Sequence, residues 1–330
     1  MSESNFPKVI VVIEDLRHAL RSSALELLTW GNALGEVTVL TCSEVGDQEA
    51  IELQEFGVSK VLRASNVPAE NWSLAGVASD VIVSAVKLVG ANAVLLNSTF
   101  PNKEAAARAG FLLSAGVIID AASLRFDEDF HLVSDKRVFA GTWDILCRTK
   151  TAISLATVRA NSIIATRPAA PAVQLVVSDF EVVAQNDWSA VTLVSRSEHQ
   201  HDSSKPALAE APFVVAGGRG TLGDFSGVKR LAEVLGGAYG ATRDAVDEGW
   251  VDHDAQIGQT GVTIAPRVYI GAGISGAPHH RGGMQAAQVI IAINNDAEAP
   301  LVEISDFVVV GDANEILHQA AEYLLENWKK

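Results

Sequence analysis

Small and polar residues follow predicted strands at several points in the last third of the chain, and their types suit the binding of an anion. After the apolar run Phe213–Ala216 comes the turn GGRG at 217–220, which contains Arg219 and Gly220. Glycines expose backbone N–H groups and an arginine adds a forked cation, so such a turn can hold a phosphate or the edge of a planar ring. Because similar turns are common in α/β proteins, this turn alone predicts no particular ligand.

The segment GAGISGAPHH at 271–280 gives the most informative pattern. A predicted strand leads into a loop of small residues and then into a predicted helix. Backbone N–H groups at the start of a helix favour negative charge, so a pyrophosphate could lie against this loop. The candidate binding residues here are Gly273, Ser275, Gly276, Ala277, Pro278, His279 and His280. His279 could equally be a solvent-facing or capping residue.

Two further segments carry side chains suited to a ring or an anion. Thr242 and Arg243, in GATRDAVD at 240–247, could bind an anion or a ring edge, or could be a helix cap beside a surface arginine. The segment QIGQTG at 256–261 could hydrogen-bond the polar edge of a planar heterocycle, or could be an ordinary turn. Its candidate residues are Ile257, Gly258, Gln259 and Thr260.

Asn294 and Asp312 stand at the ends of two predicted strands. Their side chains can reach the hydroxyl groups or the adenine edge of an adenosine. Open α/β sheets bind ligands at the carboxyl ends of their strands, so these two residues complete the candidate set.

The elements that must position these residues alternate between strand and helix. In the first half the predicted strands are Lys8–Ile13, Val37–Leu40, Lys60–Arg63 and Ala93–Leu96, and the predicted helices are His18–Leu34, Glu49–Phe56, Leu74–Val89 and Lys103–Ser114. In the last third the predicted strands are Phe213–Ala216, Arg267–Ile270, Val289–Asn294 and Asp306–Val310, with helices at Asp224–Leu235, from Met284, and at Ala313–Trp328. The alternation predicts an α/β protein of two domains, each with a mostly parallel, doubly wound sheet.

The middle of the chain differs, because short apolar runs follow one another without helices between them. We expect these runs to be antiparallel additions to the first domain: Leu124–Phe126, His131–Val133, Arg137–Ala140, Ala152–Val158, Gln174–Val177 and Val191–Val194. A polar, Pro- and Ala-rich stretch then predicts a linker at 199–212 between domains at 1–198 and 213–330. His199 and His201 lie in this linker without a third ligand, so we expect no metal site.

The first predicted strand lacks the glycine-rich turn of a dinucleotide-binding domain. It is followed by Glu14-Asp15-Leu16-Arg17, which offers no glycine for close approach of the backbone to a phosphate. We therefore expect the first domain to be a scaffold or a surface for a partner protein. The same absence disfavours a nicotinamide-linked dehydrogenase.

Composition limits the partners and the compartment. The 330 residues carry 25 Lys and Arg against 40 Asp and Glu, a net charge of −15, which repels nucleic-acid phosphates and anionic membranes. The two cysteines, Cys42 and Cys147, are too few for a disulfide framework. With no recognisable targeting segment and no apolar run long enough to span a bilayer, we expect a cytoplasmic, bacterial protein that is not inserted in a membrane.

Taken in order, the glycine turns and strand ends between Val214 and Asp312 resemble the alpha subunit of electron-transfer flavoproteins. The matching segments are GGRG, GATR before AVD, QIGQTG, GISGA followed by histidine, and AIN-N-D, with Thr242 where the family usually has serine. The first 200 residues match in outline and length only. The resemblance implies a heterodimer with a beta subunit and one FAD, held mainly by a Rossmann-like, DHS-like FAD-binding domain at 213–330.

The resemblance also implies roles for single residues. Arg219 and Arg243 would favour the reduced, negatively charged forms of the flavin, Thr260 would hydrogen-bond its redox-active nitrogen, and His280 would present a cation or donor to its carbonyl O2. Thr242, Gln259, Ser275 and the backbone of Gly276–His279 would hold the phosphates and the ribityl chain. Asn294 and Asp312 would face the adenosine.

The family passes single electrons from flavin dehydrogenases, notably acyl-CoA dehydrogenases, to a quinone oxidoreductase. Fatty acid beta-oxidation would therefore supply the electrons. Such a carrier needs no catalytic base or nucleophile, because the cofactor supplies the chemistry. A non-enzymatic sensor of adenine nucleotides on a similar sheet is the alternative, and it would bind AMP or ATP without flavin absorbance.

Overall fold

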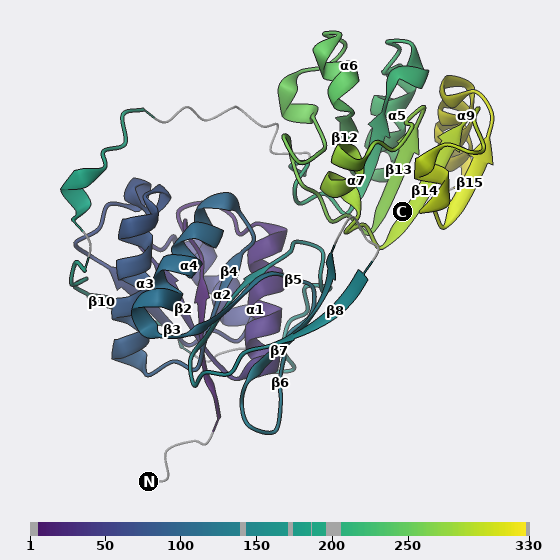
Figure 1. Ribbon diagram of the computed structural model, residues 1–330. Coiled ribbons are helices and arrows are strands. Elements are labelled where there is room, and N and C mark those ends of the chain that lie inside the picture. Colours follow the sequence, from purple (N-terminus) through teal and green to yellow (C-terminus); the bar gives the residue numbers. More distant parts are fainter. Residues whose placement is uncertain (1–5, 139–142, 171–173, 186, 196–205, 328–330) are drawn as a thin grey trace. The chain divides into compact units, whose positions relative to one another are not determined.

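The computed structural model describes residues 6–138, 143–170, 174–185, 187–195 and 206–327. The chain divides into two compact units, residues 1–136 with 144–198 and residues 137–143 with 199–330, and each unit is considered by itself (Figure 1). The first part of the expected linker, with His199 and His201, lies outside the described residues.

The first unit contains a seven-stranded sheet in which every recorded strand pair is parallel. In spatial order the strands are β10 (Val176–Phe180), β3 (Lys60–Ala64), β2 (Glu36–Thr41), β1 (Lys8–Val12), β4 (Ala93–Asn97), β9 (Ser154–Val158) and β5 (Gly116–Ala121). Successive residues of β1 enter opposite cores, with Ile10 in one and Val11 in the other. This alternation requires helices on both faces, as parallel sheets do.

Four helices cover the two faces of this sheet. Helices α3 (Ala75–Val89) and α4 (Phe100–Leu113) contribute Val81 and Ala106 to the core that contains Ile10. Helices α1 (Ser22–Leu34) and α2 (Asp47–Glu55) contribute Leu28 and Leu53 to the opposite core. The predicted doubly wound α/β architecture is confirmed for this unit.

The expectation of antiparallel strands in the middle of the chain is mostly wrong. Strands β9 and β10 belong to the main parallel sheet, and β5 was not predicted at all. All residues of β9 are buried, because it lies between β4 and β5 with both faces covered. Residues 191–195 form no strand.

The antiparallel expectation holds for a small three-stranded sheet of β6 (Arg125–Phe126), β7 (Leu132–Val138) and β8 (Trp143–Arg148), in which β6 and β7 pair antiparallel. This excursion separates β5 from β9. It allows the chain to return and add β9 parallel to β5, which a tight turn cannot do.

The second unit contains a five-stranded sheet, again parallel throughout. In spatial order its strands are β12 (Ala238–Ala241), β11 (Phe213–Gly217), β13 (Val268–Ala272), β14 (Val289–Asn294) and β15 (Phe307–Val310). The order reverses at β11, because β12 is added on one side of it and β13 on the other. Doubly wound sheets bind ligands at the carboxyl ends of strands beside such a reversal.

Helices cover both faces of this second sheet as well. One face carries α5 (Ser226–Leu235), the short α6 (Arg243–Asp247) and α9 (Ala313–Asn327), and α5 and α9 pack side by side (Figure 1). The other face carries α7 (Pro278–Met284) and α8 (Pro300–Glu303). Helix α7 ends at Met284, where the sequence predicted a helix to begin. Among the described residues no helix is both long enough and apolar enough to cross a membrane.

The position of β9 inside the sheet can be tested by truncating Leu155, which is fully buried. Leu155→Ala should lower the free energy of unfolding by about 2–5 kcal/mol, because it leaves a cavity between packed layers. Val191→Ala, at a side chain that is 62% exposed, is the control and should change it by less than about 0.5 kcal/mol. Equal, small effects in urea unfolding would contradict an interior β9.

Candidate functional site

A cavity of about 400 Å3 lies at the carboxyl ends of the strands of the second sheet. Loops that follow β11, β12, β13 and β14 all contribute to its wall. Its lining consists of Arg219, Gly220, Thr242, Asp244, Gly273, Ile274, Ser275, Asn294, Asp296 and Ala299. The cavity therefore occupies the place where a doubly wound sheet is expected to bind its ligand.

The turns after β11 and β13 meet backbone to backbone beside this cavity. The N–H of Gly218 donates to the carbonyl oxygen of Ala272 at 3.0 Å, and the N–H of Gly220 donates to that of Gly273 at 2.9 Å. A Cβ on Gly220 would lie 2.5 Å from the Cα of Gly273, closer than real Cβ atoms approach. Both positions therefore need glycine, and Gly273 also has a positive φ of 63°.

The loop after β13 offers backbone donors to a ligand. Within the described part of the chain, the N–H groups of Ile274, Ser275, Gly276 and Ala277 have no hydrogen-bond acceptor. Asn294 holds this loop in place, because its Nδ2 donates to the carbonyl oxygen of Ile274 at 3.0 Å. A fixed row of unengaged N–H groups beside a cavity suits the oxygens of a pyrophosphate.

Thr242 gives a second sign of a missing polar partner. Its Oγ1 atom is buried and has no hydrogen-bond partner among the described residues, although the residue lines the cavity. Its backbone N–H donates to the carbonyl oxygen of Gly217 at 3.0 Å, which ties the turn after β12 to the turn after β11. A buried hydroxyl without a partner costs free energy that a bound polar group would recover. Together with the free N–H groups, it fits the phosphates of a dinucleotide.

The two candidate arginines differ in position. Arg219 lines the cavity, where its Nε lies 3.1 Å from Oδ2 of Asp244. Arg243 does not line the cavity, and its Nε lies 3.2 Å from Oδ2 of Asp247 one turn along α6. Both side chains are exposed to solvent, so each can exchange its carboxylate partner for an anionic ligand at little cost.

His280 lies beneath the loop rather than in the cavity. Its side chain is buried, with Nδ1 3.1 Å from the carbonyl oxygen of Ile257 and Nε2 2.7 Å from the hydroxyl of Tyr269. A nitrogen facing a carbonyl must carry the proton, so Nε2 is the acceptor for Tyr269. Burial lowers the pKa of His280 to about 4. Desolvation therefore favours the neutral ring over the cation at this position. A contact between His280 and the flavin stays a prediction.

The remaining candidates lie around the cavity or away from it. Five candidates are exposed and do not line the cavity: Gln259, Thr260, Ala277, Pro278 and His279. Ile257 and Gly258 are buried below them. Asp312 accepts the N–H of Glu315 at 3.0 Å and so caps the start of α9.

Of the candidates, the structure brings Arg219, Gly220, Thr242, Gly273, Ser275 and Asn294 together around the cavity. Sequence reasoning missed Asp244, Ile274, Asp296 and Ala299 as lining residues. Asp244 and Asp296 each follow a candidate by one or two positions at a strand end, so their spacing alone was a usable signal.

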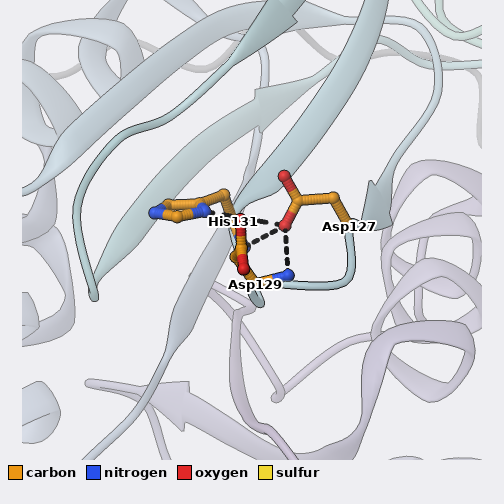
Figure 2. Close-up of side chains that lie close together, drawn as sticks. All are labelled: Asp127, Asp129 and His131. Atoms are coloured by element: carbon orange, nitrogen blue, oxygen red, sulfur yellow. Dashed lines mark hydrogen bonds and ion pairs between the residues drawn. The ribbon is translucent and has the colours of Figure 1, made fainter.

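A second polar cluster lies in the first unit and does not support a metal site. Asp127, Asp129 and His131 gather in the turn between β6 and β7 (Figure 2). The guanidinium of Arg148 contacts all three, with Nη2 3.0 Å from Oδ2 of Asp129 and 2.9 Å from Nδ1 of His131, and Nε against Asp127. The arginine already supplies the positive charge that a cation would bring.

Comparison with known protein families gives two matches along this chain. Residues 9–185 match the family model described as electron transfer flavoprotein domain. Residues 207–285 match the model described as electron transfer flavoprotein FAD-binding domain, which includes most of the cavity lining.

Curated relatives agree with these matches over nearly the full length. Electron transfer flavoprotein subunit alpha of Mycobacterium leprae is 34% identical over 96% of this chain and 97% of its own. The subunits of the same name from Clostridium acetobutylicum and Bacillus subtilis are 32% and 31% identical, over 96% and 94% of this chain and 96% and 95% of their own. Among solved structures, a UDP-N-acetylglucosamine 2-epimerase from Listeria monocytogenes aligns over 98% of this chain and 88% of its own, with 13% identity. Its TM-score of 0.34 is too low to indicate a shared fold.

The crossing of the two glycine turns can be tested with a matched pair of alanine variants. Gly273 and Gly236 have similar positive φ values, 63° and 65°, but a Cβ on Gly236 would meet nothing within 4 Å, whereas one on Gly273 would lie 2.6 Å from the Cα of Gly220. Gly236→Ala should cost about 1–2 kcal/mol of stability and leave ligand affinity unchanged. Gly273→Ala should in addition weaken FAD binding at least about tenfold, since it displaces the turn of Gly220. Equal FAD affinities by fluorescence titration would contradict the crossing as a requirement for binding.

The neutral state of His280 predicts a pH dependence of stability. Its pKa is about 4 in the folded chain against an ordinary value of 6.5, so the unfolded chain binds more protons between these values. The contribution of His280 is complete above pH 6.5 and is lost as the pH falls toward 4. In urea unfolding across this window, the wild type should lose about 1.4 kcal/mol per pH unit more than His280→Gln, which cannot titrate. Parallel pH profiles for the two proteins would show that His280 is not buried as a neutral ring.

Proposed function

Because the chain belongs to the electron transfer flavoprotein alpha-subunit family and binds FAD, we propose that it carries single electrons between flavin dehydrogenases and an acceptor such as a quinone oxidoreductase. It acts as one subunit of a heterodimer with an electron-transfer flavoprotein beta subunit. Acyl-CoA dehydrogenases of fatty acid beta-oxidation are the donors that the family resemblance favours, and the cytoplasm of a bacterium is the compartment.

The observation that supports this proposal is the set of unengaged donors around the cavity. Ile274, Ser275, Thr242 and Arg219 all line one cavity of about 400 Å3. The N–H groups of Ile274 and Ser275 and the buried Oγ1 of Thr242 have no hydrogen-bond partner among the described residues, and the row of free N–H groups continues through Gly276 and Ala277 next to the lining. In the proposal Thr242, Gln259, Ser275 and the backbone of Gly276–His279 hold the phosphates and the ribityl chain, and Arg219 acts on the flavin ring. In the proposal Asn294 and Asp312 face the adenosine. Asn294 lines the cavity, and Asp312 follows β15 and does not line it.

Two of the residues proposed to meet the flavin ring, Thr260 and Arg243, do not line the cavity. Thr260 lies beside Gln259 at an exposed loop tip, and Arg243 is 69% exposed on α6. A ring bound among these residues would be open to a second protein on one side. Such access suits a carrier that must exchange electrons with several partners, because no substrate has to enter a closed site.

The chemistry itself belongs to the cofactor, which accepts and releases electrons when bound. The chain's contribution is to hold it and to set the electrostatic field. Arg219 and Arg243 supply positive charge, which favours the reduced, negatively charged flavin over the oxidised flavin. The net charge of −15 on the whole chain favours basic protein partners and disfavours nucleic acid and anionic membranes.

The direct test is the visible spectrum of the complex purified with its natural partner subunit. A yellow complex that is bleached by an acyl-CoA dehydrogenase and its substrate supports the proposal. A colourless complex that binds AMP or ATP but no flavin would instead favour a sensor of adenine nucleotides.

The role of Arg243 can be tested with Arg243→Ala in the flavin-loaded complex. Removing an exposed cation near the ring should lower the midpoint potential for the first electron by the equivalent of on the order of 1 kcal/mol, and more if the cation is desolvated. Arg230→Ala, an exposed cation on α5, is the control and should leave the potential unchanged. An unchanged potential in Arg243→Ala, measured by reductive titration, would exclude this role.

A further inference from the structure

The loop that carries Thr260 is internally cross-linked by its own backbone. The N–H of Val262 donates to the carbonyl oxygen of Gln256 at 2.7 Å, and the N–H of Gly258 donates to that of Val262 at 3.2 Å. The N–H of Ile257 donates to the carbonyl oxygen of Ala241 at 2.9 Å, which fastens the loop to the end of β12. Residues 256–262 thus form a tight loop closed by its own hydrogen bonds, and its exposed tip consists of Gln259 and Thr260.

Each exposed side chain at this tip is held by a partner. Oε1 of Gln259 lies 2.9 Å from Nδ1 of His279, at the start of α7. Oγ1 of Thr260 accepts a hydrogen bond of 3.0 Å from Nε2 of Gln256. Gln256 is only 3% exposed, and both its backbone groups are engaged, with His253 and Val262. The buried amide is therefore fixed, and it fixes the threonine hydroxyl.

The direction of this hydrogen bond decides what Thr260 can do. An amide nitrogen donates only, so the threonine oxygen is the acceptor and keeps its own proton for another partner. Within the described part of the chain, the Thr260 hydroxyl has no other hydrogen-bond partner, and the residue is exposed. A hydroxyl held in this way is a donor aimed away from the protein.

We propose that Gln256 is a positioning residue for the flavin: its buried amide orders the Thr260 hydroxyl as a hydrogen-bond donor and so raises the potential of the first electron. The inference rests on the proposed function, in which Thr260 meets the redox-active part of the ring. As an electron arrives, negative charge builds on the ring and a donor is attracted more strongly than before. The effect of Gln256 is exerted through Thr260 and requires its hydroxyl.

Three single variants and their combinations in the complex with the partner subunit separate this role from a structural one. Gln256→Met keeps the volume and removes the donor, Gln256→Glu replaces the donor with an acceptor for the threonine proton, and Thr260→Val removes the hydroxyl at nearly constant shape. Gln319→Met is the matched control, because the Gln319 amide also donates to a side-chain oxygen but lies on α9. The readouts are the one-electron midpoint potential, the FAD dissociation constant and the thermal unfolding midpoint.

The expected result is a coupling between the two residues. Gln256→Met should lower the affinity for the reduced flavin relative to the oxidised flavin by about tenfold, which is 59 mV for one electron. Gln256→Glu should lower this relative affinity further, since the new carboxylate accepts the threonine proton and turns the hydroxyl toward the protein. In the Thr260→Val background Gln256→Met should change this relative affinity by less than about twofold, which is under about 20 mV, and Gln319→Met should leave it unchanged.

Other results overturn the inference. If Gln256→Met shifts the potential equally with and without the Thr260 hydroxyl, the glutamine does not act through the threonine. If Gln256→Glu leaves the potential at the wild-type value, the amide does not hold the hydroxyl as a donor. If Gln256→Glu fails to fold, the comparison of Gln256→Met in the two backgrounds still decides. A wild-type complex that takes up no flavin contradicts the proposed function, whereas loaded variants with unchanged potentials contradict only the role of Gln256.

Discussion

The binding edge of the second sheet depends on the crossing of two turns at backbone distance. The turns after β11 and β13 touch through Gly220 and Gly273, and a hydrogen bond of 2.9 Å joins them. A side chain at either position would push the turns apart. Their contact brings Arg219 from the turn after β11 and Ile274 and Ser275 from the loop after β13 to the same cavity. The cation and the row of unengaged N–H groups thus meet because two residues have no Cβ.

The first sheet shows what the same fold does without such turns. Its order also reverses beside β1, between β2 and β4, but polar side chains bond to one another at the strand ends. Nδ2 of Asn102 donates to Oε1 of Glu14 at 2.7 Å, and Nε1 of Trp72 donates to Oδ1 of Asn102 at 3.1 Å. On the other side of β4, Lys103 pairs with Asp120 at 2.7 Å. Groups that satisfy each other leave less for a phosphate at this edge of the sheet. The role of this unit as a scaffold or partner surface stays a prediction.

Much of this architecture could be predicted from the sequence, and the failures have physical causes. Apolar runs and glycines at strand ends predicted both parallel sheets and much of the cavity lining, because strand and turn follow local rules. The position of β9 could not be predicted from local sequence, because only its pairing with β4 and β5 makes Ser154–Val158 an interior strand. His279 and His280 are adjacent in sequence, but neighbouring helix residues point about 100° apart. Met284 lies four residues after His280, on the same buried side of α7. This apolar residue at helical spacing was the sequence signal that His280, rather than His279, is buried.

Binding of FAD by the N–H groups of the loop after β13 can be tested by amide hydrogen exchange of the complex with and without FAD. We expect exchange within residues 273–280 to slow when FAD is bound, because the N–H groups of residues 274–277 gain acceptors and lose contact with water. Exchange at residues 13–17 of the first unit should not change. Protection at residues 13–17 without protection at 273–280 would show instead that the cofactor binds at the first sheet.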